Sequence, residues 1–257
     1  MTVLRALARG VLPGPVRAWL RRRLDSDAPP PVGRVRFGDL RRTVPITRNW
    51  GYDRGLPIDR YYIERFLAAH AGDVRGRVLE VGDDRYTRRF GAAGVTRGDV
   101  LNVAPGAPAT TIVADLALPE TLPAEQFDCV IVTQTLQLVD DVRAAVRSLH
   151  RTLRPGGVVL ATMPGISQTH HADWGAAWRW SFTTLSARSL FESAFAPAEV
   201  AVEAHGNVLA ATAFLQGLAV EDLRREELDQ DDPDYQVSIL VRAVKQNAYF
   251  SRWPSPV

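Results

Sequence analysis

The chain has 257 residues, of which 46% are hydrophobic and 23% charged, as is ordinary for a soluble globular protein. Its formal net charge of +2 gives no reason to expect a nucleic-acid partner, and no apolar stretch approaches the ~18 residues of a membrane span. Cys129 is the single cysteine, which excludes an internal disulfide and fits a reducing, cytoplasmic setting.

Residues 1–34 are predicted to form a basic helix followed by a linker. Arginines alternate with leucine, valine and tryptophan up to residue 25, and the proline-rich stretch "SDAPPPVGR" follows. The helix either docks on the next domain or forms a mobile tail. The alternative is peripheral contact with a membrane surface, through Leu4, Leu7, Trp19 and Leu20.

From residue 57 onward, helix and strand patterns alternate. Residues 57–72 predict a helix with Asp59 as its cap and an apolar stripe of Ile63, Phe66 and Leu67. Five strands are predicted at residues 77–82, 95–103, 110–116, 127–136 and 156–165. Val142, Val146 and Leu149 recur at helical spacing between the last two strands, and the Pro155-Gly156-Gly157 turn ends that helix.

The remaining pattern predicts a helix at residues 181–195 and two late strands, within 198–215 and 235–245, around a helical segment. Almost continuously apolar strands separated by helices are typical of a sheet covered on both faces. We therefore predict an α/β fold with a Rossmann-like doubly wound sheet, mostly parallel with one or more late antiparallel strands. This domain covers residues 35–245, with a tail at 246–257.

The loop after the first strand, within "RVLEVGDDRYTRRFG", is acidic and poor in glycine. Glu80 and Gly82 come at the carboxyl end of the strand, where ligands bind in such sheets, and Gly82 permits close backbone approach. The loop lacks G-x-G-x-x-G, and Asp83-Asp84 would repel a phosphate. The pattern therefore favours a cationic ligand and argues against a nucleotide-dependent oxidoreductase.

Four segments, taken in order, resemble the class I S-adenosylmethionine (SAM) methyltransferases, in a type 11-like form. They are "VLEVG", "VADL", "FDCVIVTQTLQLVDD" and "LHRTLRPGGVVLATMPG", and the resemblance extends from about Ile46 to Lys245. The sequence departs from the family in its glycine-poor first loop and in Gln137, where many relatives carry histidine. The resemblance implies a methyltransferase with SAM as its cofactor.

The resemblance also implies roles for individual residues. Glu80 and Gly82 would border the methionine part of SAM, and Asp99 would bind the ribose hydroxyls, with Asn102 as the alternative. Asp115 and Leu116 would flank the adenine. Thr133 and Gln134 would line the pocket near the sulfonium. Each residue also has a structural interpretation: Glu80 as a helix cap, Asp115 as a turn cap, and Cys129 as a core residue.

Residues 48–62, "RNWGYDRGLPIDRYY", resemble a segment of a bacterial subgroup linked with sugar or natural-product pathways. Arg54 or Arg60 would bind the carboxylate of SAM through forked hydrogen bonds, and Tyr61 or Tyr62 would cover the cofactor or meet the substrate. The alternative is a surface lid whose arginines pair with Asp53 and Asp59.

The loop after the fifth strand, residues 165–183, contains the candidate catalytic groups. His170 and His171 are general-base candidates, and Asp173 would orient one of them or act itself. Three tryptophans would stack on a sugar or aromatic ring: Trp174, Trp178 and Trp180. Alternatively, the tryptophans belong to the core and the histidines are solvated. No metal cluster is predicted.

These residues predict O-methylation of a small molecule, namely a sugar, glycoside or related secondary metabolite. If neither histidine reaches the acceptor, an amine or carboxylate acceptor on a small molecule or peptide becomes favoured. A non-catalytic binding or scaffolding protein with the same fold is the rival from another class. RNA methylation lacks support, because no basic patch with interleaved aromatics follows the N-terminal arm.

Overall fold

The computed structural model describes residues 30–172 and 175–246, with the backbone alone at residue 92. The basic helix predicted within residues 1–25, Asp173, Trp174 and residues 247–257 of the predicted tail lie outside this part. The chain divides into two units, Met1–Thr43 and Val44–Val257. In the described part of the first unit, Gly38–Leu40 forms a 3-10 turn. The second unit contains the sheet.

The sheet has seven strands in the order β3-β2-β1-β4-β5-β7-β6. Six pairings define it, of which those of β7 with β5 and β6 are antiparallel and the others parallel. The strand bounds are β1 Gly76–Val81, β2 Val95–Asn102, β3 Ile112–Val113, β4 Phe127–Thr133, β5 Leu153–Pro164, β6 Val200–His205 and β7 Ser238–Val244. This order and the late antiparallel strand confirm the predicted fold class.

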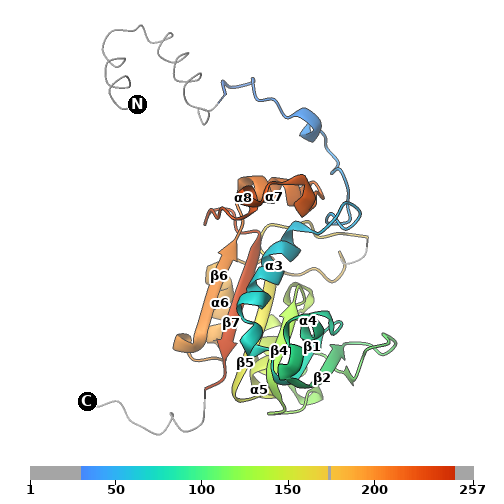
Figure 1. Ribbon diagram of the computed structural model, residues 1–257, viewed down its shortest axis with the longest axis vertical. Helices are drawn as coiled ribbons and strands as arrows, with labels where there is room; N and C mark the ends of the chain where they lie inside the picture. Colours follow the sequence, from blue (N-terminus) through green and yellow to red (C-terminus); the bar gives the residue numbers. More distant parts are fainter. Residues whose placement is uncertain (1–29, 173–174, 247–257) are drawn as a thin grey trace, which may run out of the picture. The chain divides into compact units, whose positions relative to one another are not determined.

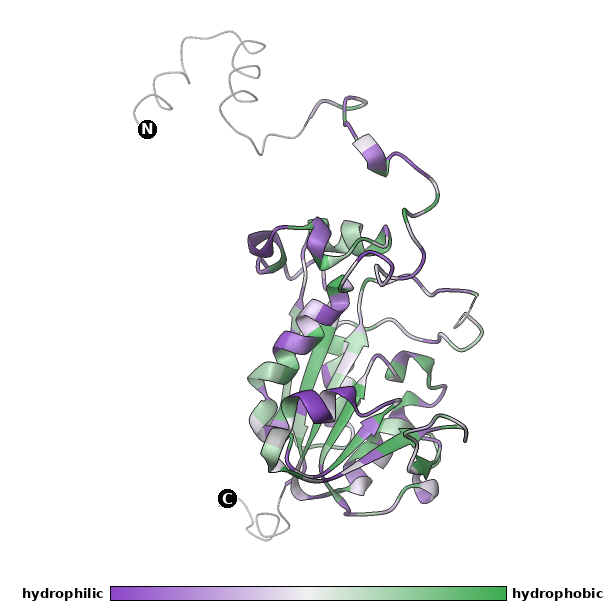
Figure 2. Cartoon of the chain, turned by 45° about the vertical axis from the view of Figure 1, so that its right-hand side comes forward, coloured by the Kyte–Doolittle hydropathy of each residue, from purple (hydrophilic) through white to green (hydrophobic). Residues whose placement is uncertain are grey.

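Helices cover both faces of the sheet (Figure 1). Their bounds are α3 Ile58–Ala69, α4 Arg85–Phe90, α5 Val142–Thr152, α6 Thr184–Glu192, α7 Val208–Leu215 and α8 Arg225–Leu228. Helix α3 packs on β7 and α4 on β1, whereas α5 packs on β5 and α6 on β6. Figure 2 shows hydrophobic strands at the centre of the sheet and hydrophilic residues along the covering helices.

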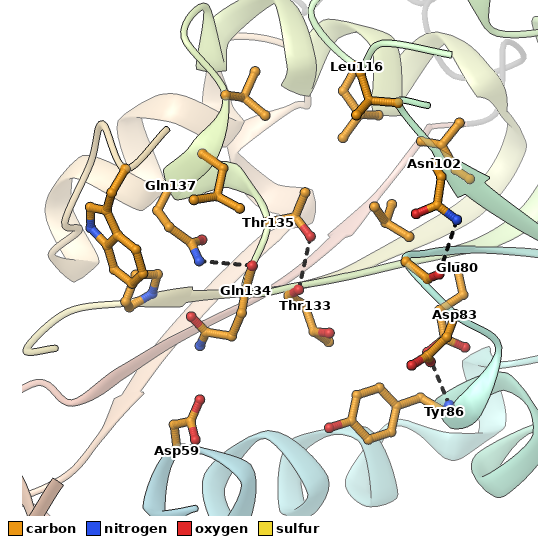
Figure 3. Close-up of a pocket in the computed structure, with 18 of the residues that line it drawn as sticks. Asp59, Glu80, Asp83, Tyr86, Asn102, Leu116, Thr133, Gln134, Thr135 and Gln137 are labelled. Atoms are coloured by element: carbon orange, nitrogen blue, oxygen red, sulfur yellow. Dashed lines mark hydrogen bonds between the residues drawn. The ribbon is translucent and has the colours of Figure 1, made fainter. Parts of the chain in front are cut away.

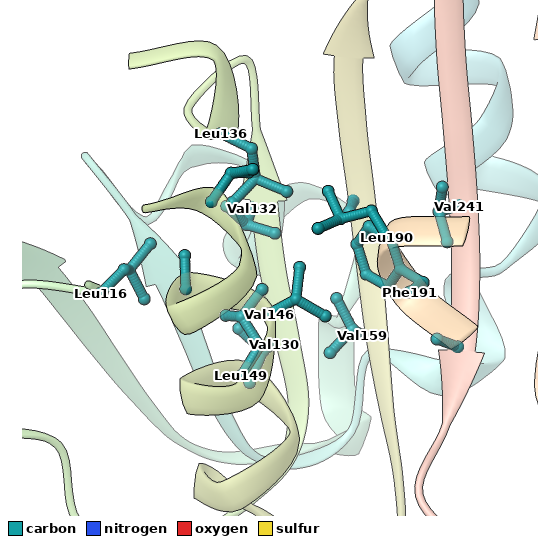
Figure 4. Close-up of a cluster of buried hydrophobic side chains, with 14 of the residues drawn as sticks. Leu116, Val130, Val132, Leu136, Val146, Leu149, Val159, Leu190, Phe191 and Val241 are labelled. Atoms are coloured by element: carbon teal, nitrogen blue, oxygen red, sulfur yellow. The ribbon is translucent and has the colours of Figure 1, made fainter. Parts of the chain in front are cut away.

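Successive side chains of β4 point to opposite faces of the sheet, and each face has its own hydrophobic cluster. Val130 and Val132 face the cluster that contains α5 and α6, and Figure 4 shows them beside Val146 and Phe191. Cys129 and Ile131 face the opposite cluster, with Ile63, Phe66 and Leu67 of α3. A strand buried on both faces explains the continuous apolar run from which it was predicted. Cys129 is fully buried, and burial strongly raises the pKa of its thiol, as suits a core residue.

Three local predictions need correction. Asp59 does not cap α3, because the N-cap residue is Pro57 and Asp59 lies inside the first turn, buried. The third strand is only two residues long at the sheet edge. The Pro155-Gly156-Gly157 turn lies inside β5, not before it: Phe127 pairs with Leu153 but Cys129 with Val158, so the residues between bulge out of register.

Within residues 30–172 and 175–246, no helix is long and apolar enough to cross a membrane.

Candidate functional site

A cavity of about 820 Å³ lies at the carboxyl ends of β1, β2 and β4. Gly82 follows β1, Asn102 ends β2 and Thr133 ends β4, and all three residues line it. Strand β1 has β2 on one side and β4 on the other, so the strand order reverses here. Ligands of doubly wound sheets bind at this switch point.

Glu80 organises the glycine-poor loop after β1. Its carboxylate accepts hydrogen bonds from the backbone N–H groups of Tyr86, at 3.1 Å, and Thr87, at 2.7 Å. The side chain is buried yet lines the cavity. Burial raises the pKa of Glu80, while these backbone bonds oppose the shift. The residue therefore caps α4 and also contributes to the cavity wall.

Gly82 and Asn102 join the ends of β1 and β2. The Gly82 N–H donates to the Leu101 carbonyl at 2.9 Å, and Asn102 Nδ2 donates to the Gly82 carbonyl at 3.1 Å. Gly82 has a φ of +96°, and a Cβ placed on it would meet no atom within 4 Å. The conformation requires glycine, and the space beside it is open to a ligand.

Asp99 does not line the cavity, which corrects its assignment to a ribose. Strand β2 continues to Asn102, so Asp99 lies inside the strand opposite Leu79. Its buried carboxylate pairs with Arg77 at 2.7 Å and Arg97 at 3.0 Å. Burial alone would raise the pKa of Asp99, but hydrogen bonds from the two arginines bring it below its ordinary value. Asn102, at the end of β2, therefore replaces Asp99 as the candidate for binding the ribose hydroxyls.

We expect Asp99→Asn to lower the free energy of unfolding by about 1–2 kcal/mol at neutral pH, because charge-assisted hydrogen bonds are lost. The affinity for S-adenosylhomocysteine (SAH) should not change. Since the pKa of Asp99 is depressed in the folded state, its contribution is present above the unfolded pKa and is lost as pH falls. Urea unfolding should therefore show the gap between wild type and variant closing below about pH 4. A gap independent of pH would contradict this assignment.

Asp115, Leu116, Thr133 and Gln134 all line the cavity, as the resemblance implies. Asp115 also caps a turn, since its Oδ1 accepts from the Ala117 N–H at 2.8 Å. Gln134 has a φ of +46°, its N–H donates to the Thr162 carbonyl at 2.9 Å, and its own carbonyl accepts from Gln137 Nε2 at 2.8 Å. A non-glycine residue held in the left-handed region is strained, and such residues cluster at functional sites.

The 48–62 segment supplies different cavity residues from those predicted. Arg54 forms a forked pair with Asp222, at 2.9 and 2.6 Å, and Tyr61 donates to Asp229 at 2.6 Å. Neither Arg54 nor Tyr61 lines the cavity, and neither does Tyr62, which is fully buried and donates to the Leu228 carbonyl at 3.2 Å. These three residues attach the segment to α8 and its flanking loops.

The same segment places Trp50, Tyr52, Asp59 and Arg60 in the cavity wall. Arg60 donates to the hydroxyl of Tyr52 at 3.0 Å and to that of Tyr86 at 3.3 Å. Burial would lower the pKa of Arg60, but Asp59 and the two phenols raise it overall. Of the two predicted arginines, Arg60 is thus the one at the cavity. The partner of Arg54 is 168 residues away, which local pattern cannot reveal.

Of the loop after β5, Trp178 and Ser167 line the cavity. Trp180 does not; it is exposed, and its indole N–H donates to the Val139 carbonyl at 2.8 Å. The His170 ring contacts that of Trp50 at a tilt of 31°, with 4.4 Å between ring centroids, and His171 is exposed. Neither histidine lines the cavity, so the structure does not support them as the general base.

The double variant His170→Ala/His171→Ala should retain methyl transfer within about threefold of the wild-type rate, because no acid–base step passes through a residue outside the cavity. Initial rates with a fixed acceptor would measure this. A loss of a hundredfold or more, with the melting temperature unchanged, would restore the histidines to the catalytic group.

Four buried polar atoms in the cavity wall have no hydrogen-bond partner among the residues that the structure describes. They are Asp59 Oδ1, Gln134 Nε2, Gln137 Oε1 and Trp178 Nε1. Buried polar groups are normally satisfied, so atoms of this kind that border a cavity indicate a polar ligand. Figure 3 shows Asp59, Gln134 and Gln137 at one end of the cavity, and Glu80, Asn102 and Leu116 at the other. Among the residues described, no group of three or more possible metal ligands occurs.

One family model matches part of the chain. Residues 92–161 match the family model described as "Methyltransferase domain". No curated protein sequence matches the chain.

Several solved structures are similar at low identity. A SAM-dependent methyltransferase from Archaeoglobus fulgidus is 10% identical, with 72% of this chain and 94% of that chain covered and a TM-score of 0.49. One from Mesorhizobium loti is 18% identical, with 73% and 98% covered and a TM-score of 0.47. The N-methyltransferase NodS from Bradyrhizobium japonicum, in complex with SAH, is 14% identical, with 79% and 95% covered and a TM-score of 0.47.

These structural similarities are too distant to indicate an activity. The assignment of a methyltransferase domain therefore rests on the family match. The matched segment runs from the loop before β2 into β5, and so contains Asn102, Asp115 and Thr133 of the cavity. The match confirms the prediction of a methyltransferase domain within residues 92–161.

Proposed function

We propose that the protein transfers the methyl group of SAM to a hydroxylated or amine-bearing small molecule bound in the switch-point cavity. The observation that carries the proposal is the arrangement of the wall: an acidic, partly apolar end near β1 and β2, and an end with unpartnered polar atoms near α3 and the loop after β4. A volume of about 820 Å³ is within the range of ligand pockets.

The residues of the first end suit SAM, which carries a sulfonium and an ammonium group. We propose that Leu116 packs on the adenine and that Asp115 accepts from its amino group. Asn102 would bind the ribose hydroxyls, and the loop from Glu80 to Gly82 would border the methionine part. Asp115 supplies negative charge along this wall, which favours a cationic ligand, whereas the carboxylate of Asp83 is paired with Arg85 at 3.1 Å.

SAM supplies an already activated methyl group. The chain therefore has to hold the acceptor atom in line with that group, exclude water, and accept a proton where the acceptor releases one. A sugar, glycoside or related secondary metabolite is our first acceptor hypothesis, because Trp178 offers an aromatic surface and the unpartnered amides offer hydrogen bonds. With neither histidine at the cavity, an amine acceptor becomes a close alternative and a carboxylate acceptor a third.

Incubation with isotopically labelled SAM tests this proposal. The acceptors would be a methyl glycoside, an amino sugar, a phenolic amine and a carboxylic acid, with products detected by mass spectrometry. We expect label in a hydroxylated or amine compound, and NMR would assign the methylated atom. Label only in a base-labile ester would favour the carboxylate alternative. SAH binding without any labelled product would contradict the proposed acceptor class.

The predictions about cellular location and domain bounds stay proposals. We propose a cytoplasmic location, supported by a single cysteine that is buried in β4. The methyltransferase domain predicted at residues 35–245 is proposed to act as one domain from Val44 onward, because residues 35–43 belong to the other unit.

A further inference from the structure

Asp59 is a buried carboxylate that the cofactor end of the cavity does not use. It lies in the first turn of α3, with 9% of its surface exposed, and it lines the cavity. Its Oδ1 has no hydrogen-bond partner among the described residues. Figure 3 shows its carboxylate projecting from α3 toward Gln134, at the end away from Asn102 and Leu116. Ionisable side chains are rarely buried in this way without a function.

The nearest charged side chain to Asp59 lies beside Oδ2, so Oδ1 is available to a ligand. Arg60 Nε is 3.9 Å from Oδ2, and that guanidinium donates its short bonds to Tyr52 and Tyr86 instead. Burial raises the pKa of Asp59, and Arg60 only partly opposes the shift. The group combines proximity to a cavity with greater basicity than an ordinary aspartate, which are the properties of a general base.

Three further atoms in the same cavity wall have no partner within residues 30–172 and 175–246. Gln134 Nε2 and Trp178 Nε1 are donors without such an acceptor, and Gln137 Oε1 is an acceptor without such a donor. Together with Asp59 Oδ1 they offer two donors and two acceptors. A polyhydroxylated molecule or an amino alcohol presents both kinds of group on neighbouring carbons, which matches this mixture of donors and acceptors. A purely apolar acceptor would leave them buried and unpaired, at a cost in affinity.

We propose that Asp59 binds the nucleophilic hydroxyl or amine of the acceptor and takes its proton, and that Gln134, Gln137 and Trp178 hold the neighbouring polar groups. For a hydroxyl acceptor, the O–H bond breaks as its proton moves to Asp59 Oδ1, and an oxygen electron pair forms the bond to the transferred carbon. For a neutral amine, the nitrogen lone pair forms that bond first, and an N–H proton then moves to Asp59 Oδ1. In both cases the pair of the broken carbon–sulfur bond stays on sulfur. This inference rests on the proposed methyl transfer and names the acceptor side of that site.

The experiment compares wild type with Asp59→Asn, Asp59→Glu and the control Glu64→Gln. Glu64 lies on the same helix but pairs with Arg89 at 2.7 Å and does not line the cavity. Each protein is titrated with SAH by calorimetry, assayed with labelled SAM and the methyl glycoside and amino sugar, and melted at neutral pH and near pH 4.

We expect SAH to bind all four proteins equally, and Asp59→Asn to lose about a hundredfold or more in kcat. Asp59→Glu should recover part of the rate, and Glu64→Gln all of it. Because the pKa of Asp59 is raised in the folded state, its stabilising contribution is full below the unfolded pKa and is lost as pH rises. The melting temperature of wild type should therefore fall, relative to that of Asp59→Asn, as pH increases from about 4 to neutral.

Each other outcome overturns the inference in a distinct way. A wild-type rate in Asp59→Asn would remove Asp59 from the reaction, and a parallel loss of SAH binding would assign it to the cofactor end. Wild type that binds SAH but methylates neither probe would exclude the acceptor class. Wild type that fails to bind SAH at all would instead contradict the proposed function itself.

Discussion

Replacing Glu80 by alanine should abolish measurable SAH binding and lower the free energy of unfolding by about 3 kcal/mol. The carboxylate accepts two backbone N–H groups at the start of α4, at 3.1 and 2.7 Å, and it is 2% exposed. Alanine leaves both donors buried without a partner. It also frees the loop from Gly82 to Arg85, which borders the cavity.

Glu80→Gln is the matched control for this prediction. Its side-chain carbonyl can accept one of the two N–H groups, whereas its amide N–H₂ cannot, so we expect an intermediate loss of about 1–2 kcal/mol. Urea unfolding gives the stability and calorimetry the affinity, measured on protein that circular dichroism shows to be folded. Full SAH affinity in folded Glu80→Ala would show that this loop does not border the cofactor.

The second large effect is expected from a pair of glycine variants, Gly51→Ala and Gly82→Ala. Both glycines have a positive φ, +94° and +96° respectively. A Cβ on Gly51 would lie 2.5 Å from the Leu218 carbonyl oxygen, whereas a Cβ on Gly82 would meet nothing within 4 Å. The two substitutions therefore carry a similar conformational cost, of about 1–2 kcal/mol, but only the first adds a backbone clash.

We expect Gly51→Ala to lower the free energy of unfolding by about 3 kcal/mol or more, since the 48–62 segment has to move off the backbone at Leu218. Gly82→Ala should cost only the conformational part, yet weaken SAH binding about tenfold, because its methyl group enters the ligand space. Urea unfolding and calorimetry of both variants provide the comparison. Equal losses of stability, with equal SAH affinities, would contradict the assignment of the open space beside Gly82 to a ligand.

Most of the fold was predictable because the signal is local. The apolar run of β4 is continuous, since both of its faces are buried, and Val142, Val146 and Leu149 mark the covering face of α5. The position of the cavity was predicted from the carboxyl end of the first strand, and the observed strand order reverses at that point. Leu116 and Gln134, which the family resemblance assigns to cofactor binding, line this cavity, and their binding roles stay predictions.

The errors arose where a long-range partner or a strand boundary decides the outcome. Asp99 and Asn102 are three residues apart, and only the true end of β2 shows which of them reaches the cavity. Arg54 and Tyr61 donate hydrogen bonds to Asp222 and Asp229, which belong to a segment far along the chain. His170 and His171 were predicted to be general-base candidates only because imidazole can accept a proton near neutral pH, and the sequence does not show whether they reach the cavity. Asp59 was interpreted as a cap, although the proline two residues earlier already occupies that position.

The central claim is that the switch-point cavity binds SAM, and calorimetric titration of the folded protein with SAH tests it most directly. We predict one binding site per chain with a micromolar dissociation constant, weakened about tenfold by Gly82→Ala and unchanged by Asp99→Asn. Absence of SAH binding in folded wild type would contradict the claim. Equal affinity in wild type and Gly82→Ala would place the cofactor elsewhere in the molecule.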